Sequence, residues 1–251
     1  MRRFAFVFFL IMLFFTTTHP AFGNIVAFSN PINLSNSPSL LTFGTDITAS
    51  GNNVYAVWVD STVGGGDIFF RRSIDGGATF SSTINLSNDV GSSLFPHVVA
   101  SGNSVYVIWS NGSEGSEEIF FRRSIDGGAT FSSTINLSNI AGSSTSSSLA
   151  VSGNVYAVWE DNTGLTGSNS DIFYKRSTDG GANFENPVKN LSNSPTNSSV
   201  DPLIIASGTN VYVLWNDGVT ADADDIFFAR STDSGANFSS PANLSNNSQS
   251  S

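Results

Sequence analysis

Residues 68–88 read Ile-Phe-Phe-Arg-Arg-Ser-Ile-Asp-Gly-Gly-Ala-Thr-Phe-Ser-Ser-Thr-Ile-Asn-Leu-Ser-Asn, and residues 119–139 repeat all 21 positions without a change. The closing tetrapeptide Asn-Leu-Ser-Asn also ends at Asn36, Asn193 and Asn246, so its five copies are spaced by 52, 51, 54 and 53 residues. All four tryptophans follow the same spacing, at 58, 109, 159 and 215. Such a period predicts a repeat architecture in which each repeat is one supersecondary unit.

Each repeat contains four segments with the composition of β-strands. In the second repeat they are centred on residues 97–100, 105–109, 118–123 and 134–137, and Gly-, Asn- and Ser-rich turns separate them. The second segment is apolar at every position, so it needs cover on both faces, which radially stacked sheets provide. No segment of the mature chain has a sustained helical period. We therefore predict an all-β fold, a β-propeller of four-stranded antiparallel blades.

Four turns between the third and fourth segments share the pattern Ser-x-Asp-x-Gly-Ala-x-Phe. This pattern resembles the Asp box, or bacterial neuraminidase repeat, of the sialidase-like propellers, which is Ser-x-Asp-x-Gly-x-Thr-Trp. An Asp in such a turn can accept backbone N–H groups, and a required positive φ would explain why the second glycine is kept in all copies. The resemblance implies that the box residues are structural. They are Ser73, Asp75, Gly77, Phe80, Ser124, Asp126, Gly128, Phe131, Ser177, Asp179, Gly181, Phe184, Ser231, Asp233, Gly235 and Phe238.

The first 23 residues have the composition of a secretory signal peptide. Arg2 and Arg3 precede the apolar run 4–15, and small residues follow at Ala21 and Gly23. The run is short for a membrane span, although an uncleaved anchor is the alternative. We expect one propeller domain, residues 24–251, with repeats at approximately 45–88, 89–139, 140–193 and 194–246. Residues 28–36 match the end of a repeat and predict an extra fourth strand before the first blade.

Composition excludes several classes of function. The chain has no cysteine, so disulfides, thiol chemistry and Cys-ligated metals are excluded. Its formal net charge is -10, and removal of residues 1–23 leaves 8 basic and 20 acidic residues, a charge of -12. Because such a chain repels phosphate backbones, we expect no nucleic-acid partner. The predicted location is extracellular or at the cell surface, with no stable membrane span after cleavage.

The resemblance raises the question of sialidase activity, which the residues do not favour. Family members clamp a carboxylate with three arginines, use a Tyr–Glu pair and an acid/base Asp, and carry an Arg-Ile-Pro motif, which this chain lacks. Its six arginines after the signal segment all lie one or two residues before an Asp box. The tyrosines at 55, 106, 156 and 212 fill one repeated slot. Catalytic residues break repeat symmetry, so we predict none; His97 has no evident partner in the sequence.

The repeats differ most in the acidic loops between their second and third segments, which lie opposite the Asp-box turns. Loop variation on one side of a repeat array is typical of a binding face. The candidate ligand-binding residues are Asp60, Asp67, Glu114, Glu118, Asp161, Asp171, Asp217 and Asp225. Such loops suit hydroxyl-rich ligands such as glycans, or a cell-surface protein. Calcium, which prefers oxygen ligands, is an alternative ligand for Asp222, Asp224 and Asp225, and plain solvated loops are the third interpretation.

The sequence favours a secreted, non-catalytic binding or surface-interaction module. An exo-sialidase-type glycoside hydrolase is one alternative, and a structural protein that self-associates through open blade edges is another. We expect no cofactor other than calcium. The Asn-x-Ser triplets that begin at 33, 85, 136, 190 and 243 match the glycosylation sequon, but their regular place indicates a structural turn.

Overall fold

The computed structural model describes residues 30–38, 41–61, 65–88, 91–112, 116–140, 142–162, 169–194, 197–218 and 225–245. The predicted signal peptide, residues 1–23, lies outside them. The chain divides into a short unit, residues 1–33, and a unit of residues 34–251 that contains every described strand. Among the described residues there is no helix, and therefore none long and apolar enough to cross a bilayer.

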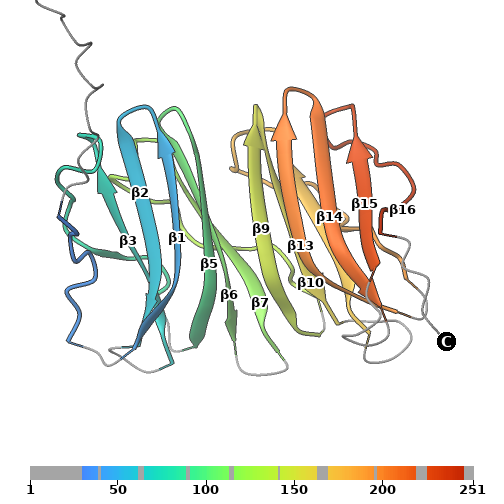
Figure 1. Ribbon diagram of the computed structural model, residues 1–251, viewed down its shortest axis with the longest axis horizontal. Helices are drawn as coiled ribbons and strands as arrows, with labels where there is room; N and C mark the ends of the chain where they lie inside the picture. Colours follow the sequence, from blue (N-terminus) through green and yellow to red (C-terminus); the bar gives the residue numbers. More distant parts are fainter. Residues whose placement is uncertain are drawn as a thin grey trace, which may run out of the picture. The chain divides into compact units, whose positions relative to one another are not determined.

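Sixteen strands form four antiparallel sheets, each made of four consecutive strands (Figure 1). The predicted all-β fold of four-stranded antiparallel sheets is thereby confirmed. The extra strand predicted at residues 28–36 is wrong for its described part, because residues 30–36 form no strand and pair with no sheet. The first sheet has β1 (Thr42–Ser50), β2 (Asn53–Asp60), β3 (Asp67–Ser73) and β4 (Ile84–Asn85). The second has β5 (Ser92–Ser101), β6 (Ser104–Gly112), β7 (Glu118–Ser124) and β8 (Ile135–Asn136). The third has β9 (Ser144–Ser152), β10 (Asn154–Asp161), β11 (Asp171–Ser177) and β12 (Lys189–Asn190). The fourth has β13 (Ser198–Ser207), β14 (Asn210–Gly218), β15 (Asp225–Ser231) and β16 (Ala242–Asn243).

The first strand of the second sheet begins before the segment predicted at residues 97–100, because it continues through a β-bulge, and the other first strands have the same bulge. In β5 the pairing with β6 shifts between Leu94 and His97, and Phe95 there has a φ of 52°. The equivalent residues in the other sheets also have positive φ: Gly44 (57°), Ser146 (49°) and Asp201 (53°). Only glycine takes such angles without a steric cost. Three of the four bulges therefore hold a strained residue at the same place.

The sheets stack in chain order, and the hydrophobic core lies between neighbours. The first strands contact each other from sheet to sheet, β1 with β5, β5 with β9 and β9 with β13. Between the first two sheets, Val57 and Phe70 of one pack with Val98 and Trp109 of the next. Equivalent clusters fill the two following gaps. Burial of apolar surface stabilises a fold by about 25 cal/mol per Å². Because the second strands of the two middle sheets are covered by a neighbouring sheet on both faces, both of their faces are apolar.

Each Asp-box turn joins the third and fourth strands and closes on its own hydrogen bonds. In the first turn Asp75 Oδ1 accepts the N–H of Thr79 at 2.9 Å, and the Ser73 hydroxyl donates to the same oxygen at 2.7 Å. The Ser73 hydroxyl also accepts the N–H of Gly77 at 2.9 Å. The other three turns repeat this pattern. The hydroxyls of Ser73 and Thr79 lower the pKa of Asp75 to about 2, since they stabilise the ionised form.

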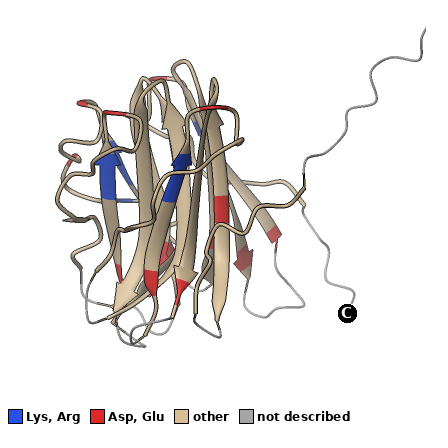
Figure 2. Cartoon of the chain, turned by 90° about the vertical axis from the view of Figure 1, so that its left-hand side faces the viewer, with Lys and Arg blue, Asp and Glu red and all other residues tan. Residues whose placement is uncertain are grey.

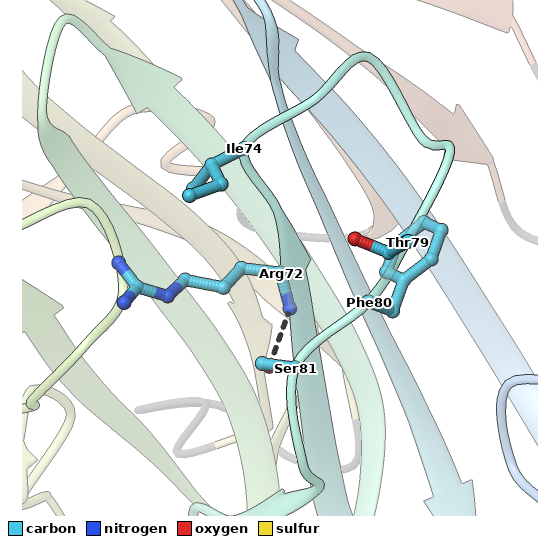
Figure 3. Close-up of a pocket in the computed structure, with 5 residues that line it drawn as sticks. All are labelled: Arg72, Ile74, Thr79, Phe80 and Ser81. Atoms are coloured by element: carbon cyan, nitrogen blue, oxygen red, sulfur yellow. Dashed lines mark hydrogen bonds between the residues drawn. The ribbon is translucent and has the colours of Figure 1, made fainter.

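The arginine directly before each of the first three Asp boxes reaches across to the turn of the next sheet. Arg72 Nη1 donates to the carbonyl of Gly127 at 2.8 Å, and its side chain extends away from its own turn (Figure 3). Arg123 and Arg176 do the same toward Gly180 and Ser234, at 2.9 and 2.8 Å. The predicted position of the arginines beside the turns is thus explained by a role in joining sheets.

The Asp-box phenylalanine and the second glycine complete the same junction. Phe131 packs edge-on against Phe70 of the preceding sheet, with 4.9 Å between ring centroids. A Cβ at Gly128 would lie 2.6 Å from Cζ of Phe70, whereas at Gly127 the nearest atom outside the turn would be 3.5 Å away. The first glycine position tolerates Ser234 at a φ of 59°. Positive φ alone therefore does not explain which glycine is kept; the close approach of the neighbouring ring does.

Candidate functional site

The two ends of the sheets carry opposite charges on their strands. Figure 2 shows Lys and Arg on the strands toward the end with the Asp-box turns, and Asp and Glu at the opposite strand ends. The second strands end and the third strands begin at this acidic end, so the predicted ligand-binding acids that are described gather there. Glu114, Asp222 and Asp224 lie outside the described residues. No cluster of three acidic or histidine residues suited to a metal occurs in the described ranges.

The acid that opens each third strand is held by the Asn-Leu-Ser-Asn motif of the same sheet. Asp67 accepts hydrogen bonds from Asn85 Nδ2 at 2.8 Å and from the Ser87 hydroxyl at 2.7 Å. The Ser87 hydroxyl in turn accepts the N–H of Ile68 at 3.0 Å. We call this arrangement the Asn-Ser clasp. It recurs at Asp171 and Asp225, and Glu118 accepts from Ser138. The clasp fastens the short fourth strand to the third, which accounts for the most regular motif in the sequence.

The acids that end the second strands are also engaged within the protein. Asp60, Asp161 and Asp217 lie directly opposite the acids of the third strands in the ladder, and all three are buried. Asp161 accepts from the Ser144 hydroxyl, and Asp217 accepts from Asn197 Nδ2 at 2.9 Å and the Ser199 hydroxyl at 2.8 Å. A ligand would have to compete with these hydrogen bonds. Other residues of the acidic end are therefore better placed to bind a ligand.

A different group of polar residues interrupts the repeat on the first strands. Asp46 and His97 occupy one slot, which is serine in the third sheet and leucine in the fourth. Asp46 Oδ2 accepts the N–H of Val98 at 2.8 Å and lies 3.7 Å from His97 Nε2. His97 Nδ1 accepts the N–H of Leu149 at 3.2 Å. No partner for His97 was evident in the sequence because its two partners, Asp46 and Leu149, come from other repeats.

These contacts fix the protonation of the imidazole. A backbone N–H can only donate, so Nδ1 of His97 is unprotonated and the ring hydrogen resides on Nε2, which faces Asp46. Burial lowers the pKa of His97 below its ordinary value, and the nearby carboxylate of Asp46 opposes that effect. The pair is therefore a neutral imidazole beside a carboxylate, and about a third of each side chain is exposed.

A second interruption lies on the third and fourth sheets. Glu160 stands where the other sheets have Val59, Ser110 and Asn216. Its carboxylate accepts the hydroxyl of Thr145 at 2.7 Å and the N–H of Asp201, the bulge residue of β13, at 3.0 Å. This carboxylate thus bridges two neighbouring sheets beside their bulges.

Phe95 is the most unusual residue of the acidic end. It is 57% exposed although it belongs to a strand of a packed sheet, and its φ of 52° is costly for a bulky side chain. Phe95, Asp46, His97, Glu160 and Asp201 together form what we call the repeat-breaking set. Comparison of the first and second strands slot by slot reveals these departures in the sequence, whereas the arginines and tyrosines follow the repeat.

Two hollows lie at the opposite end, beside Asp-box turns. One is lined by Arg72, Ile74, Thr79, Phe80 and Ser81 (Figure 3), and the other by the equivalent residues of the second sheet. Because they belong to the identical segments 68–88 and 119–139, these hollows follow the repeat and mark no individual site.

No protein-family model matches the chain, and no curated protein is similar to it in sequence. Solved structures resemble it in fold. A protein of unknown function from Dyadobacter fermentans has a TM-score of 0.63 at 12% identity, covering 80% of this chain and 68% of that one. The GH43 endo-arabinanase from Bacillus licheniformis has a TM-score of 0.50 at 13% identity, with 82% and 81% covered. The xylan beta-1,4-xylosidase from Bacillus halodurans has a TM-score of 0.51 at 15% identity. The similar region covers 82% of this chain but only 42% of the enzyme. These structures share the propeller fold, and the two with a named activity are an arabinanase and a xylosidase rather than sialidases.

Proposed function

We propose that the protein is an exported, non-catalytic β-propeller that binds glycans at its acidic end through the repeat-breaking set. The observation that carries the proposal is Phe95, an exposed aromatic ring held in a strained conformation. Strain of this kind persists where the surrounding structure enforces it and often accompanies a binding role. An aromatic face offers an apolar platform for the C–H side of a sugar ring, while polar groups nearby fix its orientation.

The carboxylates of the set supply the polar half of such a site. Asp46 and Glu160 are oriented by backbone N–H donors, and an ionised carboxylate has acceptor positions left for sugar hydroxyls. The neutral His97 presents its Nε2–H beside Asp46, and about a third of its side chain is exposed. Two of the structures similar in fold are an endo-arabinanase and a xylan beta-1,4-xylosidase, which supports the same ligand class. The signal-like N-terminus supports export.

Binding to an array of plant and animal glycans tests the proposal, followed by calorimetry on the best ligand. Phe95→Ala is expected to weaken binding at least tenfold, a loss of about 1.4 kcal/mol. Ile125→Ala is the matched control, since Ile125 is 69% exposed but lies in an Asp-box turn at the other end. Equal affinities of the two variants, or no glycan bound by the unmodified protein, would contradict the proposal.

Glycoside hydrolysis is the second candidate, and the carboxylates of Asp46 and Glu160 are the observation that favours it. Hydrolysis of a glycosidic bond ordinarily needs two carboxyl groups flanking it. A sialidase-type mechanism also needs converging arginines, whereas Arg72, Arg123 and Arg176 are engaged at the sheet junctions of the other end. Chromogenic arabinofuranosides, xylosides and sialosides should give no turnover above background. Turnover that Glu160→Gln abolishes would favour the enzyme instead.

A further inference from the structure

The three junctions between sheets are built from the same parts. At each junction an arginine donates to an Asp-box carbonyl of the next sheet, an Asp-box phenylalanine packs against an aromatic ring of the preceding sheet, and apolar faces are buried between. The face of the fourth sheet that points away from the third is called the tail face. The face of the first sheet that points away from the second is called the head face.

The tail face carries the arginine half of a junction, and among the described residues no other sheet packs extensively against it. Several of its apolar residues are exposed, and two of them have buried equivalents in all the other sheets. Ile205 is 67% exposed, and Leu214 and Ile226 are over a third exposed, whereas Val57 and Ile68 at the last two slots are buried. Phe228 and Arg230 stand where Phe70 and Arg72 stand in the first sheet. No contact of the Arg230 guanidinium is found among the described residues. The exposed apolar side chains of this face are Leu203, Ile205, Leu214, Ile226 and Leu244.

The head face carries the Asp-box half. Ile47 is 66% exposed, whereas Val98 at the same slot of the second sheet is 2% exposed. Phe43, on the same strand, is also exposed. The first Asp box lacks an incoming arginine among the described residues, and a Cβ at Gly76 or Gly77 would meet no atom within 4 Å. Trp58, at the slot of Trp109, is only 3% exposed, so the open part of this face is limited to its edge along β1 and the first Asp-box turn.

We propose that the tail face of one molecule docks on the open edge of the head face of a second copy of this chain, using the arginine, aromatic and β1 contacts of the other junctions. Arg230 then donates to the carbonyls of the first Asp box, Phe80 packs against Phe228, and Ile47 enters the place that Val98 fills elsewhere. A copy of the chain suits this place because the tail face presents the same donor, ring and apolar slots that receive an Asp box at the other three junctions.

The contact is heterologous, since head meets tail, and such contacts close into rings when the rotation permits. Within the described residues the first sheet makes no extensive packing with the fourth. Two copies joined head to tail at both ends give eight four-stranded blades, which is within the usual range of propellers. The interaction surface is independent of the glycan site, because the repeat-breaking set does not contribute to it.

Sedimentation velocity and light scattering on the protein without its signal segment test this inference. The unmodified protein should have twice the mass of one chain at micromolar concentration. Ile205→Asp on the tail face and Ile47→Asp on the head face should each raise the dissociation constant at least a hundredfold. Ile125→Asp is the matched control, because Ile125 is similarly exposed but lies on neither face, and it should leave the mass unchanged.

A mixing experiment distinguishes head-to-tail docking from symmetric pairing of like faces. Ile205→Asp retains an intact head, and Ile47→Asp retains an intact tail, so the two monomeric variants should associate when mixed. Their association also shows that both are folded. A monomeric unmodified protein overturns the inference, and so does a mass that falls equally with Ile125→Asp. Loss of association with only one of the two face variants indicates like-face pairing and overturns it as well.

Discussion

At Phe95 the demands of stability and of binding oppose each other. A bulky residue in the left-handed region costs about 1–2 kcal/mol, and its ring gains little from burial because it is largely exposed. The first sheet has Gly44 at the same slot, so the bulge accepts glycine. We predict that Phe95→Gly raises the free energy of unfolding by about 0.5–1 kcal/mol, after the entropic cost of glycine, while it abolishes glycan binding. Urea unfolding and calorimetry measure the two effects; a destabilised Phe95→Gly protein would show that the ring has a packing role.

The kept glycine of the Asp box allows a matched comparison of two residues with similar backbone angles. Gly77 and Gly128 have φ values of 88° and 78°, but only Gly128 faces the ring of a preceding sheet. We predict that Gly128→Ala lowers the free energy of unfolding by about 1–3 kcal/mol more than Gly77→Ala, because the added methyl group collides with Phe70. Both changes are made in the Ile205→Asp chain, in which the head face stays uncovered. Equal losses would mean that backbone strain alone governs the position.

At the scale of the element, the Asn-Ser clasp decides how firmly each fourth strand is held. The Ser87 hydroxyl joins a buried carboxylate to a strand N–H, whereas Ser245 makes the equivalent bonds in an exposed setting. Ser87→Ala should cost about 1–3 kcal/mol of stability, since it leaves Asp67 and Ile68 short of a partner where water is scarce. Ser245→Ala should cost under about 0.5 kcal/mol. Chemical unfolding of the two variants makes the comparison, and a Ser245→Ala loss as large as that of Ser87→Ala would refute the role of burial.

Some elements of the fold could be predicted from the sequence and others could not. The strands, the turns and the sheet of four were predictable, because periodicity and turn chemistry are local properties of residues such as Val105–Trp109 and the Asp boxes. The bulge at Phe95 was not, since its sequence carries no glycine there. The arginine contacts and the pair of Asp46 and His97 were also beyond prediction, because they depend on which slots of different repeats face each other across a junction. The candidate acids lie at the acidic end of the sheets, where we propose the site. Several of them are held by the Asn-Ser clasp, which their sequence did not predict.

At the scale of the whole molecule, the four Asp boxes make the free energy of unfolding depend on pH in the acid range. The pKa of Asp75 is lowered to about 2, and hydrogen bonds within the turns lower the pKa values of Asp126, Asp179 and Asp233 as well. In the unfolded chain these carboxyls titrate near 3.9. Above that pH both states are ionised and the turns contribute fully. As pH falls, the unfolded chain takes up protons first, so stability is lost progressively between about pH 4 and pH 2.

His97 should cause a separate loss of stability at higher pH than the Asp boxes do. Its folded pKa is lowered, so the unfolded chain binds the proton first as pH falls through about 6.5, and stability decreases in the same direction. Urea midpoints from pH 8 to pH 2 should therefore fall in two stages. His97→Gln should remove the upper stage and leave the lower one, whereas Asp75→Asn should lessen the lower stage only. The lower stage draws on all four sheets, so a midpoint that stays level between pH 5 and pH 2 would mean that the Asp-box bonds contribute nothing to holding the stack of sheets together.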